Sequence, residues 1–393
     1  MRRILLLSAG LWAVPLAAQG DPSLTVDGRG VTFTSADSVT RITMRFRIQQ
    51  LLTVRSDDDE DQGIDQVAFQ IRRARFRLGG TVGDPRLSFN LQLSFARSDL
   101  DSRDTDFANV LRDAAVAWRF SPNFQTIMGQ TKLPGNRQRV ISSGDLELPE
   151  RSIVNSRFTL DRDVGVQFWW ADTLGGTPVH LRTALSNGDG RNPDGNDNGL
   201  AYTARLEWQP LGPFVGGSDD FEGDLLRNPS PRLALAATTQ YNDKAVRTGG
   251  QLGPRLHDPR SMTTYEADLL FKYRGLAVYS EVATRNADDP VTTAVGEPNR
   301  FVYVGWGRLV QVSYQIGNGF APVARWALVT PDNEIANEAG GARQEQWGGG
   351  ITKYLNRHRV KTTVEVLHDK VSANAAAAER EGWIGRWALE VGI

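Results

Sequence analysis

From Val39 onward, apolar and polar side chains alternate along this chain in repeated short stretches. The clearest stretch places Leu87, Phe89, Leu91, Leu93 and Phe95 between polar neighbours. Successive side chains of a β-strand point to opposite faces of the sheet, so each stretch has one apolar and one polar face. Alternating segments of about ten residues, separated by turn residues, are typical of transmembrane β-barrels.

The alternation predicts an all-β fold, a transmembrane antiparallel barrel of about sixteen strands. An even number of strands is what single-chain bacterial barrels require. The predicted strands are 39–54, 66–82, 86–97, 110–120, 124–133, 163–171, 178–186, 199–209, 232–241, 263–273, 276–285, 302–316, 321–330, 345–355, 359–368 and 382–393. A soluble β-sandwich would also alternate. The length of the runs and the tryptophans near strand ends, which suit an interfacial aromatic girdle, favour the barrel.

The connections between these strands differ in length. Short links at 121–123, 274–275, 317–319 and 356–358 are predicted to be periplasmic turns. Long polar connections at 56–65, 98–109, 134–162, 187–198, 210–231 and 242–262 are predicted to be extracellular loops. Both chain ends would then lie on the periplasmic side.

Composition supports export to an outer membrane. The apolar run from Ile4 to Ala18 follows two arginines and is too short to span a bilayer, so residues 1–18 are predicted to be a cleaved signal peptide. Residues 19–38 would form a periplasmic segment, and residues 39–393 the barrel. The chain has no cysteine, so no disulfide holds the fold together. The formal net charge of −1 excludes a globally basic nucleic-acid binder.

Arginines concentrate on the polar face of the first two predicted strands. Arg45 and Arg47 lie on the first strand, and the second carries Arg72, Arg73, Arg75 and Arg77. The apolar phase changes between Ile71 and Ala74, so we expect a β-bulge at Arg72 and Arg73 that could turn both side chains inward. Guanidinium groups bind oxyanions with paired donors and mark anion pores. Alternatively, these arginines pair with Asp113, Glu266, Asp268, Glu281 or Glu365 and merely fill the lumen.

Several segments, in order along the chain, resemble the phosphate-selective porin O/P family. They include Arg-Arg-Ala-Arg-Phe-Arg-Leu-Gly-Gly at 72–80, Ile-Met-Gly-Gln-Thr-Lys-Leu-Pro at 127–134, Asp-Arg-Asp-Val-Gly at 161–165 and Val-Gln-Val-Ser-Tyr at 310–314. The resemblance implies a sixteen-stranded outer-membrane barrel, usually trimeric, with an inward-folded third loop. It also implies that Arg72 and Arg73 are the paired constriction arginines and that Lys132 is a lysine on the strand entering that loop.

The presumed constriction loop carries mixed charge. Its basic residues are Arg137, Arg139, Arg151, Arg157 and Arg162, and its acidic residues are Asp145, Glu147, Glu150, Asp161 and Asp163. The sequence therefore predicts a porin for passive diffusion of small anions, with phosphate-type oxyanions favoured and no cofactor. A general, weakly selective porin is the nearest alternative. The expected partners are outer-membrane lipid and lipopolysaccharide of a Gram-negative-type bacterium, two further copies of the chain, and small anions such as phosphate.

Other functions need features that the sequence supports poorly. A lipase-type barrel would need a histidine on the lipid-facing wall beside a serine. His180 alternates with apolar Val179 and Leu181 and so points inward, and His368 lies at a predicted strand end. A structural or adhesive barrel would need a plugged lumen. The four histidines have no metal-binding spacing, so no metal site is predicted.

Overall fold

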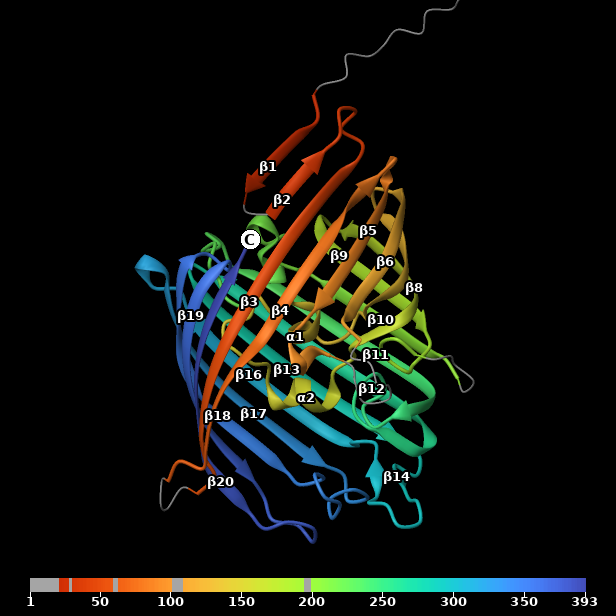
Figure 1. Ribbon diagram of the computed structural model, residues 1–393, viewed down its shortest axis with the longest axis vertical. Helices are drawn as coiled ribbons and strands as arrows, with labels where there is room; N and C mark the ends of the chain where they lie inside the picture. Colours follow the sequence, from red (N-terminus) through yellow and green to blue (C-terminus); the bar gives the residue numbers. More distant parts are fainter. Residues whose placement is uncertain (1–20, 28–29, 59–62, 101–108, 194–198) are drawn as a thin grey trace, which may run out of the picture.

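A computed structural model describes residues 21–27, 30–58, 63–100, 109–193 and 199–393 (Figure 1). One closed antiparallel sheet dominates it. The barrel strands are β3 (Arg41–Ser56), β4 (Gln66–Val82), β5 (Asp84–Ser94), β6 (Leu111–Ser121), β7 (Phe124–Lys132), β8 (Arg162–Leu174), β9 (Thr177–Ser186), β10 (Ala201–Trp208), β11 (Arg232–Arg247), β12 (Arg255–Tyr273), β13 (Leu276–Ala287), β16 (Gly305–Tyr314), β17 (Phe320–Pro331), β18 (Gln344–Asn356), β19 (Val360–Val371) and β20 (Arg380–Gly392).

These sixteen strands form a ring, because each pairs with its neighbours in sequence order and β20 pairs with β3 from Trp383↔Ser56 to Gly392↔Arg47. Closure leaves no barrel edge with unpaired backbone groups, as a membrane-spanning sheet requires. The predicted barrel and all sixteen predicted strands are confirmed, although the observed bounds of most strands differ from the predicted ones by a few residues. The strands follow from the alternation, which gives each one an apolar side for lipid and a polar side for the lumen.

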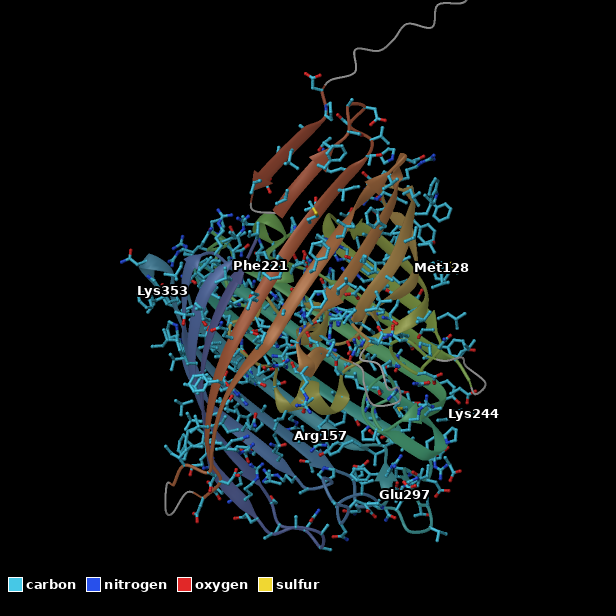
Figure 2. The ribbon with its side chains drawn as sticks, in the orientation of Figure 1. Met128, Arg157, Phe221, Lys244, Glu297 and Lys353 are labelled. Carbon is cyan, nitrogen blue, oxygen red and sulfur yellow. The ribbon has the colours of Figure 1, made fainter. Side chains whose placement is uncertain are left out.

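The outer and inner phases are those that the sequence predicts. On β20, Trp387 and Val391 are each 48% exposed, whereas Ala388 and Glu390 between them are buried. Figure 2 shows Met128 on the outer wall of the barrel. The predicted bulge is also present. Gln49 pairs with Arg73 and Gln50 pairs with Ile71, so Arg72 is the extra residue.

A small hairpin precedes the barrel. It consists of β1 (Ser23–Asp27) and β2 (Gly30–Thr34), and β2 pairs with the first residues of β3 (Figure 1). The segment 19–38, predicted only as a periplasmic extension, therefore contains two strands. The predicted signal peptide lies outside the described residues.

The two ends of the barrel differ. At the short-turn end, hairpins close through links such as Gly83, 122–123, 175–176 and 274–275. Gly175 and Gly176 both have positive φ, which suits a two-residue hairpin turn. The other end, the long-loop end, carries most of the long connections, including one with the short strands β14 (Val291–Thr292) and β15 (Arg300–Phe301).

Two predicted extracellular loops differ from the structure, one in length and one in side. Residues 242–262 are mostly strand, because β11 runs to Arg247 and β12 begins at Arg255. Residues 209–231, which contain a 3-10 segment at Val215–Asp220, join β10 to β11 at the short-turn end. Their position follows from strand alternation: β10 is the eighth barrel strand, and every even strand runs towards the short-turn end.

The third loop of the long-loop end, residues 133–161, folds into the barrel. It contains α1 (Arg137–Val140) and α2 (Ile153–Phe158), and α2 packs against β13, β16 and β17 (Figure 1). Leu146, Val154 and Phe158 of this constriction loop are almost fully buried. The inward loop expected from the family resemblance is thus confirmed. No helix in the described residues is long and apolar enough to cross a membrane.

Candidate functional site

Two adjoining cavities lie in the lumen between the constriction loop and the wall formed by β3–β9. The first has a volume of about 740 Å³ and reaches the short-turn end. Its ionisable lining residues are Arg45, Arg47, Arg75, Arg77, Asp145, Arg357, His358, Arg359 and Glu390. The cavity thus begins among residues of the β18–β19 turn and extends along the inner face of β3 and β4.

The second cavity, of about 470 Å³, shares Arg75, Arg77, Gln92, Ser142 and Asp145 with the first. Its other charged lining residues are Arg112, Asp113, Lys132, Arg139, Arg151, Arg162, Arg182 and Asp220. Among the described residues, eight basic side chains therefore face it, against three acidic ones. We call the two cavities together the basic passage.

The paired arginines Arg72 and Arg73 do not line the basic passage. Both bind Glu150 of the constriction loop, with Arg72 Nη2 2.8 Å and Arg73 Nη2 3.4 Å from Glu150 Oε2. Arg73 also donates to the carbonyl of Pro149 at 3.0 Å. Burial alone would raise the pKa of Glu150, but the charges of Arg73 and Arg72 outweigh it and lower that pKa to about 2. These two arginines hold the loop to the wall.

The other four predicted strand arginines do line the passage. Arg75 donates to Asp99 at 2.7 Å, and Arg47 and Arg75 both donate to the hydroxyl of Ser143 in the constriction loop, at 2.6 and 2.7 Å. Arg77 binds the amide oxygen of Asn90 at 2.5 Å. Arg45 lies in the first cavity with them. Within the described residues Arg77 meets no carboxylate at ion-pair distance, so its charge faces the passage uncompensated.

Lys132 and two of the four predicted loop arginines, Arg139 and Arg151, differ in what they contact. Lys132 donates to the carbonyls of Val140 and Ile141, and Arg151 to those of Gln138 and Ile141, at 2.6–3.2 Å. Carbonyl oxygens satisfy these donors without cancelling their charge. Arg139, by contrast, binds the carboxylate of Asp161. All three line the second cavity.

Arg137 and Arg157 point away from the passage. Arg137 reaches the opposite wall, where it binds Asp268 on β12 at 2.7 Å and Glu207 on β10 at 2.6 Å. Arg157, labelled in Figure 2, stacks over the ring of Tyr303 at 4.8 Å. Their positions in the sequence of the loop do not distinguish these two arginines, which point away from the passage, from Arg139 and Arg151, which line it.

Sequence reasoning missed part of the lining. Arg112, Arg182, Arg357 and Arg359 come from β6, β9 and the β18–β19 turn. Arg182 stacks on Trp169 with its guanidinium 4.6 Å from the ring centroid. Arg182 alternates on β9 with lipid-facing Leu181, so the sequence pattern already indicates that its side chain points into the lumen.

Three of the five predicted acidic partners neutralise other cations. Asp113 binds Arg162 at 2.9 and 3.1 Å, Asp268 binds Arg137 and Arg205, and Glu365 binds Arg386. The carboxylate of Glu281 accepts from Asn136 and Tyr279. The arginines of β3 and β4 instead meet Asp99, Glu150 and, at 3.8 Å, Glu390.

The histidines also have defined positions. His180 lies 3.8 Å from Glu207 on the inner face. His368 stacks on Trp347 and meets Trp383 edge-on, and its Nε2 lies 3.4 Å from Glu381. Its strand neighbours are therefore aromatic rings, with no serine among its paired residues. In the described residues no group of three or more histidines and carboxylates is placed to hold a metal ion.

Comparison with known proteins agrees with this geometry. Residues 42–215 match the model of the family described as phosphate-selective porin O and P. No curated protein matches the sequence. The resemblance seen in the sequence is thus confirmed over residues 42–215, which carry most of the basic passage.

Solved structures share the fold at low identity. The outer membrane channel DcaP of Acinetobacter baumannii is 13% identical, with a TM-score of 0.57 over 90% of this chain and 97% of that one. OmpF of Salmonella typhi, in complex with daunomycin, is 13% identical with a TM-score of 0.55, over 90% and 98%. OprB of Pseudomonas putida is 8% identical with a TM-score of 0.55, over 90% and 94%. The family match over residues 42–215 and the shared barrel together support an outer-membrane porin.

Proposed function

We propose that this porin lets small anions diffuse passively across the outer membrane of a Gram-negative-type bacterium, with phosphate-type oxyanions favoured. The observation that carries the proposal is the excess of positive charge on the basic passage. Of the residues that the structure describes, eight basic and three acidic side chains line its second cavity. Rings of arginine and lysine are the known device of anion and phosphate pores.

The strength of attraction favours passage over tight capture. One pair of unit charges 4 Å apart contributes about 1–4 kcal/mol at effective dielectrics of 80 to 20. Several of the passage cations are already paired, such as Arg75 with Asp99 and Arg162 with Asp113. We therefore expect affinity for a small oxyanion in the millimolar range, about 4 kcal/mol, which allows rapid release.

The biological setting of the proposal follows the sequence and the family. The chain is exported through a signal peptide at residues 1–18, contacts lipid and lipopolysaccharide with its apolar outer wall, and assembles as a homotrimer. Transport is by diffusion and needs neither cofactor nor catalysis.

A weakly selective general porin is the second candidate, favoured by the same ion pairs that reduce the net charge of the passage. Reversal potentials of reconstituted protein in a potassium chloride gradient separate the two. A reversal potential shifted towards the equilibrium potential of chloride, together with block of chloride current by millimolar phosphate, supports the proposal. A potential near zero without block supports the general porin.

A further inference from the structure

The β10–β11 loop (residues 209–231) is long for its position and turns back into the lumen. Every other link at the short-turn end is a brief turn. Ser218, Glu222, Asp224 and Asn228 of this loop are at most 1% exposed. In Figure 2, Phe221 lies near the short-turn end, whereas Arg157 of the constriction loop lies deeper in the barrel.

The wall of the barrel fixes this loop with charge. Lys272 on β12 is completely buried, and its Nζ donates to the carbonyls of Ser218, Phe221 and Gly223. An ammonium group has three donors, so three carbonyls satisfy it fully and offset the cost of its burial. At the far end of the loop, Asp224 accepts from the backbone N–H of Gly275 at 2.7 Å.

The loop also meets the constriction loop. The carboxylate of Glu222 accepts from the backbone N–H of Glu147 at 2.9 Å and from the side-chain amide of Gln138 at 3.1 Å. It also accepts from the amide of Gln311 on β16 at 3.1 Å. One buried carboxylate thus joins both loops to the wall.

The β10–β11 loop also borders the basic passage. Phe221 faces the first cavity and Asp220 the second. The ring of Phe221 stacks on the imidazole of His358, with centroids 4.7 Å apart. The loop therefore fills one side of the lumen and borders the open side.

We propose that the β10–β11 loop is a second constriction element that enters the lumen from the short-turn end. It sets the solute size limit and supports the constriction loop from that end. The inference rests on the proposed function as a channel. A barrel of sixteen strands leaves an aqueous channel when nothing fills it. Two loops that meet at Glu222 confine that channel to the basic passage.

The main test shortens the loop. Residues 215–226 are replaced by Gly-Gly, which is feasible because β10 and β11 are paired neighbours. We expect single-channel conductance in 1 M potassium chloride to rise about twofold or more, since an unfilled lumen of this size is water-filled. Liposome swelling should admit larger sugars. The matched control replaces residues 374–378, in a largely exposed loop at the long-loop end, by Gly-Gly and should leave both readouts unchanged.

Point variants keep the proposal testable if the shortened chain does not fold. Lys272→Met leaves three carbonyls without their donor and should raise conductance and open-channel noise, to a smaller extent than loop removal. Folding is checked by heat-dependent mobility in detergent gels. Folded variants with the conductance and size limit of the unaltered protein would overturn the inference. Anion preference in the unaltered protein would stand in that case, whereas a protein that forms no channel would overturn the proposed function itself.

Discussion

The two halves of the barrel wall use the same alternating strands for opposite purposes. On the covered wall, β10–β13 and β16–β19, the inner side chains lie under the two inward loops, and residues such as Arg205, Glu281 and Gln311 are at most 2% exposed. On the open wall, β20 and β3–β9, inner residues such as Arg77, Asn90 and Gln92 are exposed or partly exposed and line the basic passage. An inward position can therefore serve packing or passage.

Charge follows the same division. The covered wall carries Glu207 and Asp268, and the constriction loop sends Arg137 to neutralise them. The open wall carries more cations than anions and faces the cavities. A loop with balanced charge nevertheless borders a passage with excess positive charge, because Arg139, Arg151 and Arg162 line the cavities, whereas Asp145 is the one loop acid among the described lining residues. The difference teaches that net charge of a segment predicts little until each partner is known.

The largest effect is expected from breaking the covered wall's charge cluster. Asp268→Leu would leave Arg137 and Arg205 buried with only Glu207 to balance them. Removing one partner from such a buried cluster costs about 3–5 kcal/mol. Urea unfolding in detergent, followed by tryptophan fluorescence, measures the loss. Gln92→Leu, an inward change on the open wall, is the matched control, and an equal loss there would erase the distinction between the walls.

A charge added to each face sharpens the comparison further. Leu91→Arg, on the lipid face of β5, should lower the free energy of unfolding by about 2–4 kcal/mol if the position is at the bilayer midplane. Asn90→Arg, one residue away, should be tolerated because it faces the cavity. Thr238→Arg, buried on the covered wall, should cost about 1–3 kcal/mol through overpacking. Tolerance of Thr238→Arg together with intolerance of Asn90→Arg would reverse our assignment of the walls.

Selectivity should depend on open-wall cations. Arg77→Gln combined with Arg182→Gln removes two charges that have no carboxylate within ion-pair distance in the described residues. We expect the anion-to-cation permeability ratio to fall about two- to fivefold, since each screened charge contributes about 1 kcal/mol or less. Stability should change little.

Arg308→Gln is the matched control for that variant, because Arg308 stacks on Trp306 on the outer face. The selectivity of the unaltered protein should also shrink between 0.1 and 1 M salt, as the Debye length falls from ~10 to ~3 Å. A double variant with an unchanged reversal potential would place selectivity elsewhere.

The smallest expected effect is a pH dependence where the two inward loops meet. Burial and then the neighbouring Glu222 carboxylate raise the pKa of Glu147 to about 7. Lys272 and Tyr354 also face this site. Since the folded pKa is raised above the ordinary value of 4.5, the protonated form stabilises the contact. That contribution is complete below pH 4.5 and is lost as pH rises through about 7.

Open-channel noise should therefore be lower at pH 5 than at pH 8. Glu147→Gln cannot ionise and should remove this dependence while leaving the anion preference in place. Identical pH profiles for the unaltered protein and the variant would show that another group controls the noise.

The barrel could be predicted because alternation is a local property of the sequence. Each strand between Arg41 and Gly392 must offer lipid one apolar face, so sixteen strands, their phases and the bulge at Arg72 were all visible in the pattern. The exceptions were loops. Residues 209–231 are polar and long, which suggested the extracellular side, and only strand parity placed them at the short-turn end.

The sequence by itself thus determined the barrel, its two faces and the concentration of arginines on the inner face of β3 and β4. Only the tertiary structure decided which of those arginines face the passage and which hold a loop. Arg72 and Arg73 bind Glu150, more than seventy positions away in the chain, and Arg137 crosses the lumen to Asp268. Such pairings depend on how two loops fill a closed space, which no local period encodes. Whether a side chain points inward follows from its position in its own strand. Which partner an inward charge meets depends on how all the strands and loops of the closed barrel are arranged.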